Sequence, residues 1–122
     1  MNGKSFKLLA VILIAISLNS LVVAQTRIKF ARGRSAATMK GTVASGATRE
    51  FWIDVRQGQT MTVQVTSGNN KIDLEISGLS GHLEWGDNGF AQVEINESGN
   101  HTIAIRNAGR AATAYTMTVT VR

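Results

Sequence analysis

Apolar and polar residues alternate in segment after segment of this chain, and the alternation constrains the fold more than any other feature. Side chains two residues apart on a β-strand share one face of the sheet, whereas a helix needs apolar residues three or four apart. The alternation occurs in Phe51–Val55, Met61–Thr66, Lys71–Ile76, Ala91–Ile95, Thr102–Ile105 and Tyr115–Val121. Each segment therefore has an apolar face for a core and a polar face for water.

Turn-forming residues separate these segments, because Gly and Asn accept the positive φ that tight turns need. They recur at Gln57-Gly58, Gly68-Asn69-Asn70, Gly86–Gly89 and Ser98-Gly99-Asn100. Gln57-Gly58, between two alternating segments, predicts a tight hairpin. Two weaker segments, Arg27–Phe30 and Thr38–Val43, bring the total to about eight strands. The sequence thus predicts an all-β fold, an antiparallel β-sandwich or jelly roll.

The apolar faces predict a single core, since about 100 residues suffice for one core but not for two domains. Its members are expected to include Phe51, Ile53, Val63, Leu74, Val93, Ile103 and Val119. His101 is in phase with Ile103 and Ile105, so we expect it at the edge of this core. The sequence has no cysteine, so no disulfide supports the fold.

The first 24 residues carry the pattern of a cleavable signal peptide. Lys4 and Lys7 precede the apolar stretch Leu8–Ile16, and Ala24 provides a small residue before a cleavage point at Gln25. The apolar stretch is shorter than a membrane span, which needs about 20 residues. An uncleaved membrane anchor is the alternative interpretation.

We therefore expect a signal peptide at 1–24 and one β-sandwich domain at 25–122, periplasmic or secreted, with no membrane span after cleavage. Cleavage removes two lysines and lowers the formal net charge from +5 to +3. Six basic residues then precede the first acidic one, Glu50: Arg27, Lys29, Arg32, Arg34, Lys40 and Arg49. This basic third favours an anionic partner; a solvated face that aids solubility is the alternative.

The sequence offers no catalytic or metal-binding set, so we expect no enzyme, no metal and no cofactor. His82 lies near Glu84 and Asp87, but structural zinc sites normally need four ligands. No serine lies in a nucleophile-elbow motif. Nucleic-acid binding is not expected either, because Phe30 is the single aromatic residue in the basic third.

Four residues are candidates for binding a partner: Trp52, Arg106, Asn107 and Arg110. Trp52 is out of phase with Phe51, so its side chain should face away from the core, where an exposed Trp can anchor a ligand. A loop that covers this face is the alternative. Arg106 and Arg110 flank the loop before the last strand, and arginine suits the recognition of carboxylates. Simple solvation of these arginines is again the alternative.

Several motifs form a recognisable series. Phe30–Ala36 (FARGRSA) is followed by an aromatic strand and the turn Gln57-Gly58-Gln59, and later by Arg106-Asn107-x-x-Arg110 and Tyr115. In this series the chain resembles the proteobacterial periplasmic inhibitors of goose-type lysozyme. The wider group of bacterial pre-peptidase C-terminal domains shares the strand and turn pattern.

The resemblance implies an eight-stranded antiparallel sandwich that plugs the substrate cleft of a lysozyme, with the goose type favoured. In that family a pair of loop arginines and a pair of adjacent tyrosines enter the cleft. Arg106 and Arg110 match the arginines, whereas Ser45–Arg49, the corresponding region for the tyrosines, contains none. The alternative function is a non-catalytic carbohydrate- or cell-surface-binding sandwich of the pre-peptidase C-terminal type, in which Trp52 would be the more important residue.

Overall fold

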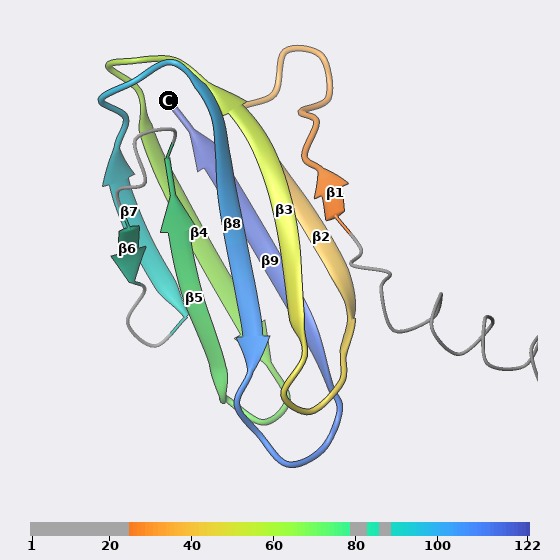
Figure 1. The fold of residues 1–122 in the computed structure, drawn as a ribbon. Helices are drawn as coiled ribbons and strands as arrows, with labels where there is room; N and C mark the ends of the chain where they lie inside the picture. The colour runs from red at the N-terminus through yellow and green to blue at the C-terminus, as the bar shows by residue number, and fades with distance from the viewer. Residues whose placement is uncertain (1–24, 79–82, 86–88) are drawn as a thin grey trace, which may run out of the picture.

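The chain folds into two β-sheets packed face to face (Figure 1). The computed structural model describes residues 25–78, 83–85 and 89–122, which form nine strands and no helix. The strands are β1 Gln25–Arg27, β2 Ala36–Val43, β3 Thr48–Val55, β4 Thr60–Ser67, β5 Ile72–Ser77, β6 Leu83–Trp85, β7 Phe90–Glu94, β8 Gly99–Asn107 and β9 Thr113–Val121. In these ranges no helix is long and apolar enough to cross a membrane. The predicted all-β sandwich is confirmed, whereas the predicted signal peptide lies outside the described residues.

Consecutive strands mostly enter opposite sheets. One sheet has the order β1-β3-β8-β5-β6 and the other β2-β9-β4-β7. All neighbouring pairs are antiparallel except β1 and β3, which run parallel. The hairpin predicted at Gln57-Gly58 is wrong, because β3 and β4 belong to different sheets. Gly58, with φ of 92°, instead lies in a turn closed by the Gln59 N–H donating to the Arg56 carbonyl at 3.1 Å. This turn carries the chain across the sandwich.

The inner faces form the predicted core. Six of the seven expected members are buried: Phe51, Ile53, Val63, Leu74, Ile103 and Val119. Val93 is only partly buried, because β7 is an edge strand of its sheet. His101 is buried at the core edge, with its Nδ1 3.2 Å from the Gly99 carbonyl oxygen, as its phase predicted.

The two short strands differ from the sequence-based expectation. The first strand was predicted at Arg27–Phe30 but spans Gln25–Arg27. Its pairing with β3 ends where the Ile28 N–H donates to the Trp52 carbonyl at 2.7 Å, after which Ile28 and Phe30 pack on the core. The three-residue β6 was not predicted, since it is too short to show an alternating pattern.

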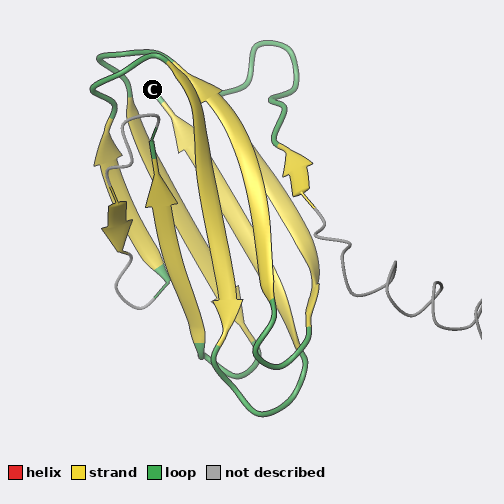
Figure 2. Ribbon diagram, in the orientation of Figure 1, coloured by secondary structure: helices red, strands yellow, loops and turns green. Residues whose placement is uncertain are grey.

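The two outer faces have different chemistry, although Figure 2 shows the same regular strands in both. The five-stranded sheet presents charged side chains: Arg27, Glu50, Asp54, Asp73, Glu75 and Arg106. The four-stranded sheet presents mostly hydroxyl and amide groups: Thr38, Thr42, Thr60, Thr62, Gln64, Thr66, Gln92, Thr116, Thr118 and Thr120. Any partner therefore meets a different surface on each side of the sandwich.

Candidate functional site

Three loops meet at one end of the sandwich, at the bottom of Figure 1: residues 44–47, 68–71 and 108–112. We call this the loop end. Hydrogen bonds join the loops to one another. The Ser45 hydroxyl donates to the Gly109 carbonyl at 2.6 Å, and the Ala108 N–H donates to the Lys71 carbonyl at 2.8 Å. The loop end is therefore one connected structure rather than three independent loops.

Asn107 lies at the centre of this structure and is fully buried, with 0% of its surface exposed. Its Nδ2 donates to the carbonyl oxygens of Val43 at 3.1 Å and Ala111 at 2.8 Å. Its Oδ1 accepts from the Gly109 N–H at 2.8 Å and from Asn69 Nδ2 at 3.0 Å. Asn107 was predicted to contact a partner, but its amide is buried and bonded within the protein. Its role is to fix the loop that carries Arg110.

The two predicted arginines lie at the loop end and are exposed. Arg106 ends the outer face of β8, with its Nη1 4.0 Å from Asp73 Oδ2. The side chain of Arg106 is 58% exposed and that of Asp73 is 57% exposed. A solvated pair at this distance contributes little to stability, so Arg106 can exchange Asp73 for another carboxylate. Arg110 projects from the exposed part of the 108–112 loop.

Two further basic residues lie at the loop end, and the sequence patterns did not single them out as site residues. Lys71 is exposed in the 68–71 loop. Arg49 is the second residue of β3 and donates from its Nη2 to the Thr42 carbonyl at 3.1 Å. Both residues are far from Arg106 and Arg110 in the sequence, so only the topology brings the four together. The loop end thus carries four cations and one carboxylate, Asp73, and the next row of the outer face adds the carboxylates of Glu50 and Glu75.

Trp52 is not part of the loop end. It lies on the outer face of β3 opposite Thr102, four residues from Arg106 along β8 and hence roughly 14 Å away. The prediction that Trp52 faces away from the core is confirmed, but the residue is half-buried. The Arg27 guanidinium carbon lies 5.9 Å from the Trp52 ring centroid, a cation–π contact. This contact covers part of the ring that a ligand would use.

The metal-binding alternative considered for the sequence falls on residues that are not described. His82 and Asp87 lie outside the described ranges, as does the side chain of Glu84. Elsewhere in the described part, no group of three or more His, Cys, Asp or Glu side chains is placed to hold a metal ion.

Comparisons with known proteins bear on this fold. No protein-family model matches the chain, and no curated protein matches it. Several solved structures, in contrast, match the chain. The periplasmic inhibitor of g-type lysozyme, PliG, from Aeromonas hydrophila superposes with a TM-score of 0.73 at 21% identity, covering 81% of this chain and 96% of that one. The chain has the fold of these inhibitors.

Two other matches support the same fold. PliG from Salmonella Typhimurium superposes with a TM-score of 0.65 at 17% identity, and the match covers 83% of this chain and 100% of the Salmonella chain. The pre-peptidase C-terminal domain of a Bacillus anthracis collagenase has a TM-score of 0.62 at 13% identity, covering 83% and 97% of the two chains. The fold is thus shared by lysozyme inhibitors and by a domain of a different kind, so the function has to be argued from the loop end itself.

Proposed function

We propose that this chain is a non-catalytic, exported inhibitor of a lysozyme, of the goose type by preference, which inserts its loop end into the substrate cleft of the enzyme. The observation that carries this proposal is the placement of Arg106 at the end of β8 and of Arg110 on the following loop, which the buried Asn107 fixes. The goose-type preference and a periplasmic location are proposed by analogy with the PliG proteins, which are periplasmic inhibitors of g-type lysozyme.

The chemistry of a lysozyme cleft fits this surface. Glycosidases generally act through a pair of carboxyl groups that flank the scissile bond. A basic surface complements that charge and favours association. Arg106 is poised to make such a contact, because its bond to Asp73 is solvated and weak.

Rigidity is the second requirement, because a loop that must be ordered on binding loses affinity. The loop around Arg110 is already ordered by bonds from Asn107 to Ala111 and Gly109. The loop 44–47 overlaps the region to which the resemblance assigns the tyrosine pair, and it is bonded to the same structure through Ser45. Small residues occupy it here, so the cations carry more of the proposed interaction in this chain.

The experiment compares single variants of the mature protein in a lysozyme inhibition assay with goose-type and hen-type enzymes. Arg106→Ala and Arg110→Ala should each raise the inhibition constant about 30-fold or more, since truncating one member of a buried charge pair costs about 2–5 kcal/mol. Arg32→Ala is the matched control, because Arg32 belongs to the connection between β1 and β2, residues 28–35, and Figure 1 shows this connection at the end opposite to the loop end. That separation exceeds the screening length of about 8 Å at physiological salt, so Arg32 should leave inhibition unchanged.

Two results would contradict the proposal. If the unmutated protein inhibits neither enzyme, the inhibitor function is wrong. If all three alanine variants lose inhibition to the same extent, the loop end is not the surface that enters the cleft.

A further inference from the structure

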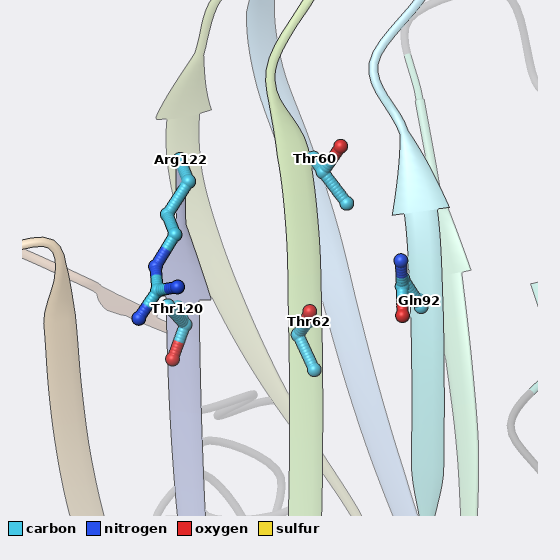
Figure 3. Close-up of a pocket in the computed structure, with 5 residues that line it drawn as sticks. All are labelled: Thr60, Thr62, Gln92, Thr120 and Arg122. Carbon is cyan, nitrogen blue, oxygen red and sulfur yellow. The ribbon is translucent and has the colours of Figure 1, made fainter.

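A second surface lies at the other end of the molecule, on the outer face of the four-stranded sheet. A shallow depression of about 380 Å³ is lined there by Thr60, Thr62, Gln92, Thr120 and Arg122. Figure 3 shows these side chains on three neighbouring strands, with the Arg122 guanidinium beside Thr120 and with Gln92 across from Thr62. The lining consists of hydroxyl groups, one amide and one guanidinium, all of which can hydrogen-bond to a neutral polar ligand.

The register extends this polar lining into two parallel rows across the sheet. Thr120 pairs with Thr62, which pairs with Gln92. In the next row Thr118 pairs with Gln64, which pairs with Phe90. Hydrogen-bonding groups therefore recur at the strand spacing of about 4.8 Å. That spacing is close to the length of one pyranose unit in an extended glycan.

Phe90 is the observation that most clearly points to a ligand. It is 42% exposed, and in the described part of the chain no other large hydrophobic side chain is as exposed. It ends the second row, beside the hydroxyl and amide groups. An exposed aromatic ring next to polar groups can stack on the apolar face of a sugar while its neighbours bond to the sugar hydroxyls.

Charge helps to select the class of ligand. On this outer face the described charged side chains are Lys40, Glu94 and Arg122, whereas the opposite sheet carries six. A polyanion needs many cations, and a protein interface needs an apolar centre with several aromatic or aliphatic residues. Neither is present around the depression. Threonine is common in strands because of its β propensity, but propensity explains neither Phe90 nor this difference in charge.

We propose that this face binds a neutral, β-linked glycan strand that runs across β9, β4 and β7. Thr62, Thr120 and Gln92 bond to sugar hydroxyls, Arg122 closes one side, and Phe90 stacks on a ring. This site is separate from the proposed lysozyme inhibition. It lies on the four-stranded sheet, whereas Trp52 lies on the outer face of the other sheet. Because β4 runs from this depression at Thr60 to the loop end after Ser67, both surfaces can be occupied at once.

The test titrates the mature protein with two soluble neutral oligomers, chitotetraose and cellotetraose, followed by NMR amide shifts and calorimetry. We expect binding of at least one oligomer, with the largest shifts in the Thr60 half of β4 and in β7. Phe90→Ala and Thr62→Val should each weaken it about tenfold. Thr42→Val is the matched control: it is an exposed position of the same face on β2 and should bind as the unmutated protein does.

Three outcomes would overturn the glycan site. They are no binding of either oligomer at millimolar concentration, an equal loss of affinity in Thr42→Val, and shifts centred on Trp52 instead of β4 and β7. The same variants separate this proposal from the inhibition proposal. Thr62→Val should leave lysozyme inhibition unchanged, and Arg110→Ala should leave glycan binding unchanged.

Discussion

Replacing Asn107 by alanine should be among the most damaging polar substitutions in this protein. The change removes four hydrogen bonds, to Val43, Ala111, Gly109 and Asn69, from a side chain with 0% exposure. A buried hydrogen bond contributes about 1 kcal/mol net, and an unsatisfied buried partner costs about 1–3 kcal/mol. We therefore expect the free energy of unfolding to fall by about 3–5 kcal/mol.

The measurement is urea denaturation of the mature protein, followed by circular dichroism and fitted for the free energy of unfolding. Asn100→Ala is the matched control, since Asn100 is an exposed asparagine on the same strand whose Oδ1 accepts one bond, from Arg27 at 3.2 Å. Its loss should be below about 0.5 kcal/mol. In conditions where Asn107→Ala remains folded, it should also inhibit lysozyme less well, because the loop that carries Arg110 loses its support.

A different result would refute this account of the loop end. If Asn107→Ala and Asn100→Ala lose similar, small amounts of stability, the Asn107 amide does not hold the three loops together. If Asn107→Ala is strongly destabilised yet inhibits normally while folded, the order of the loop is unimportant for the proposed contact.

Three further predictions concern the fold and the export segment. Leu74→Ala should cost about 2–5 kcal/mol in urea denaturation, because Leu74 is 1% exposed in the core; a loss under about 0.5 kcal/mol would contradict its placement. Gly41→Ala should lower the free energy of unfolding by about 1–3 kcal/mol, because a Cβ there would come 2.7 Å from the Tyr115 hydroxyl oxygen. Replacing Tyr115 by Phe in the same chain should recover part of this loss. If nothing is recovered, this contact is not the cause. Mass spectrometry of the exported protein should find Gln25 at its N-terminus, and an intact Met1 would favour the membrane-anchor alternative.

The sequence predicted the faces of the strands better than their partners. A period of two fixes which side chains point inward, so the burial of Leu74 and Val119 followed directly from the alternation. The turn at Gln57-Gly58 has the composition of a hairpin, yet nothing in a turn specifies whether the next strand stays in the same sheet. This is why the hairpin was predicted wrongly.

The loop end was only partly predictable for a related reason. The spacing of Arg106 and Arg110 is local, so both could be recognised from the sequence alone. Asn107 is in phase with Ile103 and Ile105, so the alternation itself places its side chain on the inner face. The bonds that make this buried amide the centre of the loop end could not be predicted, because they involve carbonyl groups of distant residues such as Val43. Lys71 reaches the same end through another loop, so only the three-dimensional topology reveals it.

The alternation of consecutive strands between the two sheets has a kinetic consequence. Among the described strands, β5 and β6 are the single ladder between neighbours in sequence, and the Thr38 and Thr118 hydroxyls that meet across β2 and β9 are 80 residues apart. Folds built on such long-range pairing close large loops before they gain contacts, and they fold in about milliseconds to seconds. The four-stranded sheet contains no pair of consecutive strands, and the five-stranded sheet contains only the short β5–β6 pair at its edge, so most of each sheet forms only after distant strands have come together. For a protein predicted to be exported, such slow folding keeps the chain unfolded while it crosses a membrane.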